Sequence, residues 1–280
     1  MSVLDHLLCP LDQHPLSWVG NSLLCPQGHS FDRARSGYVN LLPVQHKHSR
    51  DPGDSKEMVA ARREFLNGGS YRPIADALWT GVHAHFSSSQ PMTVFDAGCG
   101  EGYYLDHLVS GLREAGYTVA AQGLDISKWA VTAASKRNSE IGWIVGSNAA
   151  LPTPAARFDL LLCLFGYPVF SEFARVLKPD GLLLMADAGP DHLIELRRVL
   201  YPEIHPYRDH HAGVIDGFEP LEEQVVRFEF ELTSGAAIGQ LLAMTPHLHK
   251  APFAGREAAQ ALERIRLTAD VRLRSYRLCG

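Results

Sequence analysis

The sequence lacks any long hydrophobic segment, and its cysteines are few and odd in number. Its strongest apolar runs, FDLLLCLF and GLLLMA, are far shorter than the roughly 20 residues that cross a bilayer, so we expect no membrane span. The N-terminus has an acid and no basic segment before an apolar stretch, unlike a secretory signal. Five cysteines then favour reduced thiols or metal ligands over a disulfide framework. We therefore expect a cytoplasmic protein.

Positive charge is scarce overall but concentrated in one segment. The 280 residues carry a net charge of -5, whereas residues 33–63 hold seven Lys or Arg against three acids, a local excess of +4. The remainder of the chain therefore carries about -9. A basic segment on an acidic body favours contact with nucleic acid, although a solvated loop and helix face gives the same pattern.

The pattern divides the chain into three parts. Residues 1–34 are rich in turns and short of periodic apolar residues, which is typical of a small module held by a metal or by packing. Residues 35–90 read as an extended basic linker and two helices. Across residues 91–280, strands alternate with helices and end in two alternating segments that can pair antiparallel. This order predicts an α/β domain with a mostly parallel, doubly wound sheet.

The glycine turn VFDAGCGEG, residues 94–102, is the strongest binding signal in the chain. Its glycines give D-x-G-x-G-x-G, whereas the dinucleotide fingerprint is G-x-G-x-x-G, so the spacing argues against a simple NAD site. Glycines in such a turn let the backbone approach a ligand closely. Asp96, at the end of the first strand, is placed to orient the loop or to meet a cationic ligand.

The next two strands end in residues suited to a nucleoside. Asp125 lies at the carboxyl end of its strand, where a carboxylate can accept hydrogen bonds from both ribose hydroxyls. The following strand ends in GSNAALP, where Asn148 can contact an adenine edge and Leu151 can pack on its face. Since the glycine turn holds no lysine for a triphosphate, we predict a nucleoside pocket. The alternative is a plain strand-to-helix turn in which Asp125 caps a helix.

The segment CPLDQHPLSWVGNSLLCPQGH, residues 9–29, has nearly the ligand spacing of a zinc module. Its candidate ligands are Cys9, Asp12, Cys25 and His29, with a carboxylate where a cysteine is expected. Zinc accepts carboxylate oxygen, so these residues can close a tetrahedral site, and His14 is a substitute for the fourth ligand. The alternative is a module that has lost its metal and is held by apolar packing.

Several motifs resemble those of class I S-adenosylmethionine (SAM)-dependent methyltransferases, namely DAGCGEGYY, GLDIS, and FDLLLCLF followed by FARVLKPDGLLLMA. More narrowly, residues 25–66 and the later LLAMTPH resemble the bacterial 23S ribosomal RNA guanine-N1 methyltransferases, and the resemblance covers nearly the whole chain. It implies an N-terminal zinc-ribbon-like module joined to a methyltransferase domain that acts on a guanine in a hairpin of 23S rRNA.

The resemblance also implies roles for the residues that match the family's motifs. Gly98, Gly100 and Gly102 line the methionine and ribose of SAM, while Asp125 takes the ribose hydroxyls. Asn148 and Ala149 flank the adenine. Three of the four metal ligands match, and Asp12 at the fourth position leaves zinc binding open. The module and residues 33–63 are expected to grip the rRNA hairpin, and a homodimer is left open.

Candidates for the chemistry follow the fourth and fifth strands. Guanine N1 must lose a proton when it is methylated, so a base is expected, and its edge is hidden in a base pair, so a flipped base is expected. Asp187, after the fifth strand, is the candidate base. Phe165, Tyr167 and Pro168 are candidates for stacking or shape. The alternatives are packing for Tyr167 and helix capping for Asp187.

Two other functions fit the sequence less well. A non-catalytic rRNA-binding or assembly protein on the same fold is suggested by Asp12 alone, and the intact glycine turn and Asp125 argue against it. A small-molecule SAM methyltransferase is disfavoured by the N-terminal module and the basic segment. Methylation of 23S rRNA is therefore the leading hypothesis.

Overall fold

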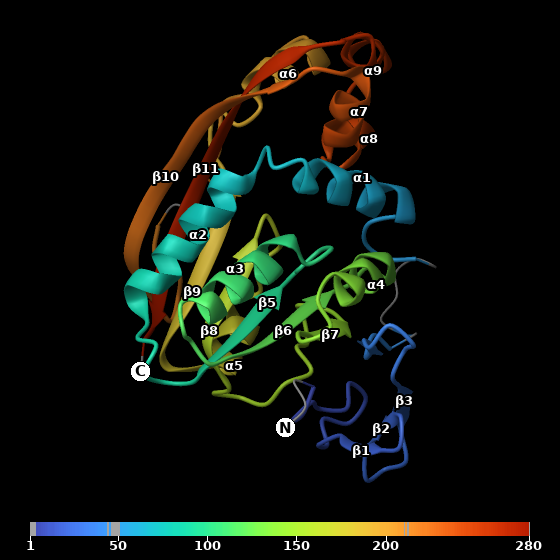
Figure 1. Ribbon diagram of the computed structural model, residues 1–280, viewed down its shortest axis with the longest axis vertical. Helices are drawn as coiled ribbons and strands as arrows, with labels where there is room; N and C mark the ends of the chain where they lie inside the picture. The colour runs from blue at the N-terminus through green and yellow to red at the C-terminus, as the bar shows by residue number, and fades with distance from the viewer. Residues whose placement is uncertain (1–3, 44, 46–50, 210, 212, 280) are drawn as a thin grey trace.

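The computed structural model, which describes residues 4–43, 45, 51–209, 211 and 213–279, is built around one eight-stranded sheet (Figure 1). The strands from β9 to β4 are parallel, whereas β11 runs antiparallel to both β9 and β10. The structure confirms the predicted α/β fold and the antiparallel pairing of the last two segments. From one edge to the other, the strands are β10 (Phe218–Leu232), β11 (Ile265–Leu278), β9 (Leu177–Ala188), β8 (Phe158–Leu164), β5 (Met92–Ala97), β6 (Val119–Asp125), β7 (Gly142–Val145) and β4 (Val39–Asn40).

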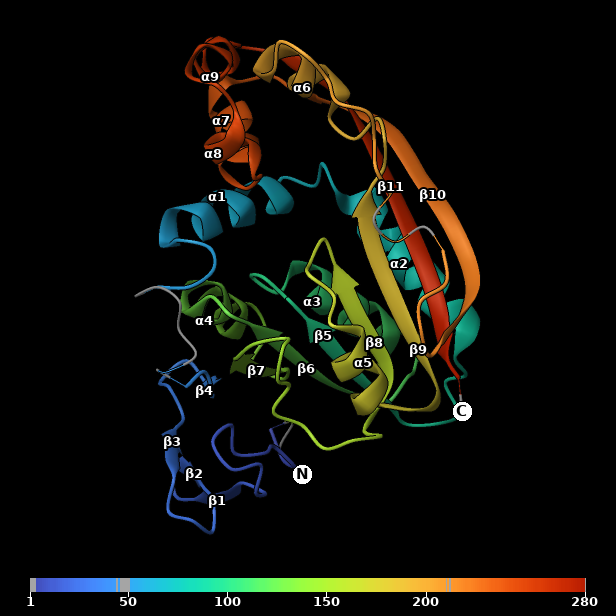
Figure 2. The same cartoon turned by 180° about the vertical axis from the view of Figure 1, so that it is seen from behind.

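The central strands are buried on both faces, and their sequences explain why. β8 reads FDLLLCL, a continuous apolar run of the kind found where helices cover both faces of a parallel sheet. One face packs against α2 (Arg72–His85), α3 (Tyr103–Glu114) and α4 (Lys128–Arg137). The other face packs against α5 (Phe170–Val176) and the N-terminal residues (Figure 2). The sheet is therefore doubly wound, as predicted.

Local signals set the starts of two helices near the functional site. The side chain of Ser55 accepts a hydrogen bond from the Met58 amide at 3.3 Å at the start of α1 (Lys56–Asn67). Ser127 does the same for the Ala130 amide at 3.2 Å at the start of α4. None of the described helices is both long and apolar enough to cross a membrane.

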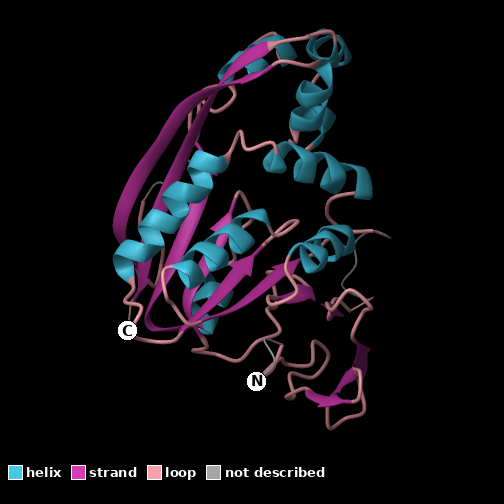
Figure 3. Ribbon diagram, in the orientation of Figure 1, coloured by secondary structure: helices cyan, strands magenta, loops and turns pink. Residues whose placement is uncertain are grey.

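Helices from distant parts of the chain stand over the carboxyl ends of the parallel strands. α1 packs against α7, and the Gln240 side chain donates a hydrogen bond to the Glu64 carboxylate at 2.6 Å between them. In Figures 1 and 3, α1, α7 and α8 stand over the end of the sheet beside the long antiparallel pair β10 and β11. These elements enclose the place where open α/β sheets bind ligands. The helices at this end of the molecule are α1 (Lys56–Asn67), α6 (Ile194–Leu200), α7 (Gly235–Ala243), α8 (His247–Lys250) and α9 (Phe253–Gln260).

The N-terminal residues form a small antiparallel sheet that is packed on the main domain. Its strands are β1 (Ser17–Val19), β2 (Ser22–Leu24) and β3 (Ser30–Asp32). The Leu8 amide donates a hydrogen bond to the Pro152 carbonyl at 2.9 Å, which ties this part to the loop after β7. β4 then joins the edge of the main sheet by pairing with β7. The basic residues Lys47 and Arg50, between β4 and α1, lie outside the described residues.

Candidate functional site

A cavity of about 1490 Å³ opens at the carboxyl ends of β5 to β9. Its walls combine the glycine turn after β5, the loops after β6 and β7, the ends of β8 and β9, and residues of α1 and the α7–α8 segment. Pockets for a single small molecule occupy roughly 300–1,000 Å³. The cavity is therefore large enough for a cofactor and part of a second substrate.

The glycine turn and Asp125 form one hydrogen-bonded unit. The Gly100 amide donates to Asp125 Oδ2 at 2.9 Å, and the Ser127 amide donates to Asp125 Oδ1 at 2.8 Å. Gly98 and Gly100 both have positive φ, at 91° and 55°, and both line the cavity. The two backbone donors fix the direction of the Asp125 carboxylate, whose remaining lone pairs are available to a ligand.

Gly102 contacts the protein core, whereas Gly98 and Gly100 line the cavity. A Cβ at this position would lie 2.7 Å from the Trp143 ring and 3.0 Å from the Ala134 side chain. Gly102 is absent from the cavity wall, so it serves the close packing of α3 against β7 and α4. The sequence pattern could not separate this glycine from its neighbours, because Trp143 lies 41 residues further along the chain.

Two buried acceptors beside the cavity have no partner among the described residues. They are Asp96 Oδ1 and Asn148 Oδ1. Burial, together with the charge of Asp125, raises the pKa of Asp96 to about 8. Both residues line the cavity, so these two oxygens are candidate acceptors for donors of a bound ligand. The ammonium group and the adenine amino group of SAM are donors of this kind.

The loop after β7 contributes unequally to the cavity. Asn148 and Ala149 line it, and the Asn148 amide nitrogen donates to the Tyr167 carbonyl at 3.2 Å, linking the ends of β7 and β8. Leu151 is only 1% exposed and lies in the core on the other side of the loop. The structure therefore brings Asn148 and Ala149 to the candidate site and leaves Leu151 behind it.

Sequence reasoning missed a lid over the Asp125 end of the cavity. The loop before α1 reaches across, where the Ser127 hydroxyl donates to the Asp54 carbonyl at 2.7 Å. Arg62 forms an ion pair with Asp54 and donates to the Met244 carbonyl at 3.2 Å. A Cβ at Gly100 would lie 3.7 Å from the Arg62 guanidinium, so this cation stands directly over the glycine turn. One cation of the basic segment thus points into the cavity.

At the ends of β8 and β9, the candidate substrate residues line the same cavity. Phe165 has a positive φ of 53°, and Tyr167 is 86% exposed; both lie in the wall, whereas Pro168 does not. Asp187 also lines the cavity and accepts a hydrogen bond from His211 Nδ1 at 3.1 Å. The buried guanidinium of Arg274 lies 3.7 Å from the same oxygen. Asp187 is therefore a carboxylate held in place from one side.

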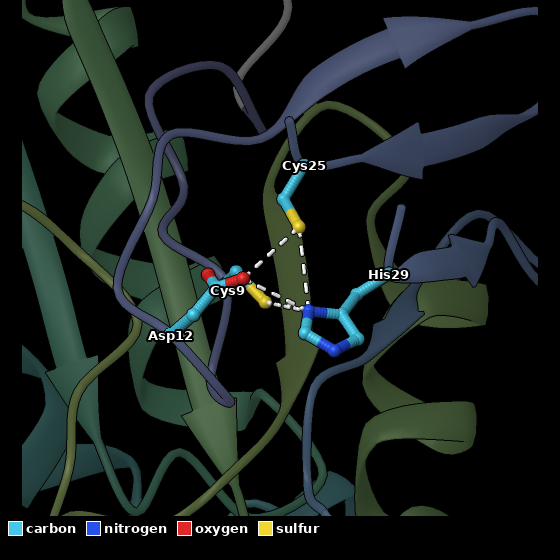
Figure 4. Close-up of side chains that lie close together, drawn as sticks. All are labelled: Cys9, Asp12, Cys25 and His29. Atoms are coloured by element: carbon cyan, nitrogen blue, oxygen red, sulfur yellow. Dashed lines mark hydrogen bonds and ion pairs between the residues drawn. The ribbon is translucent and has the colours of Figure 1, made fainter. Parts of the chain in front are cut away.

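The four candidate metal ligands come together in the N-terminal module (Figure 4). Their ligating atoms all lie within 4.8 Å of one another. His29 Nδ1 lies 3.5 Å from Cys9 Sγ and 3.4 Å from Cys25 Sγ, and 2.9 Å from Asp12 Oδ2. Cys25 Sγ lies 3.3 Å from the same carboxylate oxygen. His14 stays outside this cluster, where its amide donates to the other Asp12 oxygen at 3.0 Å.

Three of these four distances fit a tetrahedral zinc ion, and the 2.9 Å between His29 and Asp12 is shorter than the ligand spacing of such a site. With zinc–ligand bonds of about 2.0–2.3 Å, neighbouring ligand atoms of a tetrahedron lie roughly 3.3–3.8 Å apart. Burial raises the pKa of Cys9 to about 11, so a thiolate at this place needs a cation beside it. Two sulfurs, one imidazole and one carboxylate are an acceptable zinc donor set. Asp12 thus fills the fourth place in the set.

Family models match both parts of the chain. The model described as the RlmA N-terminal region, a zinc ribbon, matches residues 7–50, and a methyltransferase-domain model matches residues 94–181. The first match contains all four clustered ligands, and the second contains the glycine turn, Asp125 and Asn148. The two models therefore cover the metal cluster and the nucleoside end of the cavity separately.

Curated relatives resemble the chain over most of its length. A protein of Micromonospora griseorubida, named putative 23S rRNA (guanine-N(1)-)-methyltransferase, is 35% identical and covers 98% of each chain. A protein of Bacillus subtilis with the same name is 32% identical and covers 94% of each chain. The 23S rRNA (guanine(748)-N(1))-methyltransferase of Streptomyces fradiae is 31% identical, with 88% of this chain and 86% of that one covered.

Solved structures support the fold. A putative type II methyltransferase from Anaeromyxobacter dehalogenans superimposes with a TM-score of 0.50 at 18% identity, over 73% of this chain and 96% of that chain. Similarity at this level of identity concerns the fold alone. It agrees with the mostly parallel sheet and flanking helices described above.

Proposed function

Because this chain belongs to the family of 23S rRNA (guanine-N1)-methyltransferases, we propose how its cavity divides between two substrates. The enzyme transfers a methyl group from SAM to N1 of a guanine in 23S rRNA. SAM occupies the ends of β5, β6 and β7, and the guanine occupies the ends of β8 and β9. The observation that carries this division is the continuous cavity that joins the glycine turn and Asp125 to Asp187.

At the SAM end, each proposed contact uses a group whose orientation is already fixed. Asp125 takes the ribose hydroxyls, because two backbone amides hold its carboxylate. Asp96 accepts from the methionine ammonium, and Asn148 accepts from the adenine amino group. Ala149 flanks the adenine, and Gly98 and Gly100 allow close approach of the backbone. Gly102 and Leu151 support this wall from behind.

At the guanine end, the residues must position N1 and accept its proton. When bound, SAM supplies an electrophilic methyl group, so that an N1–CH3 bond forms as the S–CH3 bond breaks, the sulfur leaves neutral and the N1 proton goes to a base. Asp187 is the proposed base. His211 and Arg274 approach its Oδ2, and no hydrogen bond from a described residue reaches its Oδ1. Phe165 and Tyr167 offer ring faces on which a flipped base can stack.

The rRNA hairpin is proposed to lie across the N-terminal module and α4. A groove of about 610 Å³ runs between α4 and residues 34–38 at the end of the module, and no carboxylate is among its lining residues. Lys56 adds a further cation, with its ammonium 6.0 Å from the centre of the Trp129 ring. Cations beside an exposed aromatic ring suit the phosphates and bases of RNA. The groove is lined by Ala34, Arg35, Ser36, Tyr38, Lys128, Trp129, Thr132 and Lys136.

Two further aspects of the function remain proposals. An enzyme that modifies rRNA must meet it where ribosomes are made, so we place the protein in the cytoplasm. A homodimer formed through the N-terminal module is the second proposal. Sedimentation with and without the hairpin would measure that state directly.

The direct test is to incubate the protein with methyl-labelled SAM and large-subunit rRNA from cells that lack the modification. Digestion should yield labelled N1-methylguanosine from a single hairpin. Asp125→Ala should abolish labelling through lost SAM binding, whereas Asp216→Ala, in an exposed loop, should leave it intact. Label in another nucleoside, or none while SAM still binds, would contradict the proposed function.

A further inference from the structure

A chain of hydrogen bonds leads from the backbone of β11 into the guanine end of the cavity. The Asp270 amide donates to His192 Nδ1 at 3.3 Å. His192 Nε2 in turn lies 3.1 Å from the Tyr71 hydroxyl oxygen. Both His192 and Tyr71 line the cavity, although 121 residues separate them along the chain.

These two hydrogen bonds determine the direction in which the Tyr71 hydroxyl can donate its own hydrogen. An amide N–H can only donate, so His192 Nδ1 must be the acceptor and the ring proton lies on Nε2. That proton is donated to the Tyr71 oxygen. The hydroxyl hydrogen of Tyr71 therefore points away from His192. No described residue accepts it, and the cavity is the space that remains.

The surroundings of Tyr71 keep the hydroxyl rigid and protonated. Tyr71 is 3% exposed, and its ring makes edge contacts with Phe65 at 5.0 Å and Phe230 at 5.7 Å between centroids. Burial raises the pKa of its hydroxyl well above the usual value. Burial lowers the pKa of His192 to about 4, so the imidazole is neutral at physiological pH. Tyr71, held by His192, thus presents one neutral O–H donor to the cavity.

This donor lies at the end of the cavity proposed for the guanine and not at the end proposed for SAM. His192 follows β9, and its ring centroid lies 6.4 Å from that of Phe165 at the end of β8. Phe165 in turn lies 6.1 Å from the Tyr104 ring. Tyr71 therefore belongs to a wall of rings at the end of the cavity where the guanine is proposed to lie.

We infer that Tyr71 donates a hydrogen bond to O6 of the target guanine and that His192 is its positioning residue. The inference rests on the proposed placement of the guanine. As the N1–H bond breaks, the electron pair delocalises onto O6, so a preorganised donor there stabilises the charge that develops as the proton leaves. Adenine presents an amino donor at the same place, so the contact also selects guanine.

The test combines a protein change with a single-atom change in the RNA. Wild type and Tyr71→Phe are compared on the 23S hairpin carrying either guanosine or 6-thioguanosine at the target. On guanosine, Tyr71→Phe should lower kcat/KM about 100-fold, as for loss of one oxyanion donor. On 6-thioguanosine the same variant should lose far less, because sulfur is a weak acceptor. Equal losses on both substrates would overturn the inference.

A matched control and a second variant distinguish loss of the hydrogen bond to the guanine from a general structural effect of the substitution. Tyr117→Phe removes the hydroxyl of another tyrosine–histidine pair, 3.0 Å from His83 Nδ1, that is not in the cavity wall, and should leave both rates unchanged. His192→Gln, whose amide still donates, should keep more guanosine activity than His192→Leu. Unchanged activity of Tyr71→Phe on guanosine would exclude the contact, whereas inactive wild type would instead refute the proposed function.

Discussion

Asp96, a buried carboxyl, and Asp125, a half-buried carboxyl on the neighbouring strand, differ in their hydrogen-bond partners. Asp125 accepts hydrogen bonds from the amides of Gly100 and Ser127, whereas Asp96 Oδ1 has no partner among the described residues. Burial and the charge of Asp125 raise the pKa of Asp96 to about 8, so the ligand-free protein holds a proton there at neutral pH. A bound ammonium group would favour the ionised form.

The first prediction follows from this proton. The raised pKa of Asp96 means that the folded protein binds a proton which the unfolded chain has lost, from about pH 4 to pH 8. Stability without SAM should therefore fall as the pH rises through this window, by up to about 1.4 kcal/mol per pH unit. Asp96→Asn should flatten that fall in thermal melts and weaken SAM binding. An unaltered pH slope in the variant would contradict it.

The second prediction concerns zinc. The purified protein should contain one zinc per chain, because four donor atoms already lie within 4.8 Å of one another. Asp12→Cys should slow zinc release to a chelator, since a thiolate is a softer and stronger ligand, and Asp12→Ala should speed it. Elemental analysis and a colorimetric release assay measure both. Cys279→Ser, an exposed thiol outside the module, should change neither; equal release from all variants would exclude Asp12 as a ligand.

The third prediction concerns the basic groove. Replacing Arg35, Lys128 or Lys136 by alanine should weaken hairpin binding and lower the salt slope of log K by roughly 0.7–0.9 for each phosphate that is no longer neutralised. Affinity for SAM should stay unchanged. The control is Arg157→Ala, which lies just before β8, at the amino end of a central strand and outside the groove. RNA binding with wild-type affinity and salt slope in all three variants would place the hairpin elsewhere.

The fourth prediction concerns the proposed base. Asp187→Asn keeps the shape of the side chain but cannot take a proton, so kcat should fall about 10²–10⁴-fold while the Kd for SAM is preserved. Single-turnover methylation of the hairpin measures the chemical step. Asp191→Asn, four residues on in an exposed ion pair with Arg227, should retain activity. Undiminished single-turnover rates in Asp187→Asn would assign the proton to another acceptor.

The sequence predicted the parts of the site that local pattern controls. Alternating strands and helices place Asp125, Asn148 and Asp187 at one edge of the sheet, since parallel strands end together. Ligand spacing alone places Cys9 near Asp12 and Cys25 near His29, because each pair lies within a few residues of the chain. Both inferences need only the order of elements along the chain.

The parts that depend on distant packing could not be predicted. Tyr71 meets His192 only because the start of α2 packs beside β10, and neither residue belongs to a motif. Arg62 looks like any other cation of the basic segment until α1 is placed over the glycine turn. Such contacts arise from the shape of the whole core, and that shape is not written in residue spacing.

The pairing of β4 with β7 gives the N-terminal module a consequence beyond RNA. Val39 and Asn40 lie along β7, and the Leu41 amide extends this contact to the Val145 carbonyl at 2.8 Å. The module therefore keeps in place the strand that shields an otherwise open sheet edge, which is a template for aggregation when exposed. In cells starved of zinc, loss of the module's structure would then expose this edge. The protein would accumulate in the insoluble fraction before unmethylated rRNA was detected in the ribosomes.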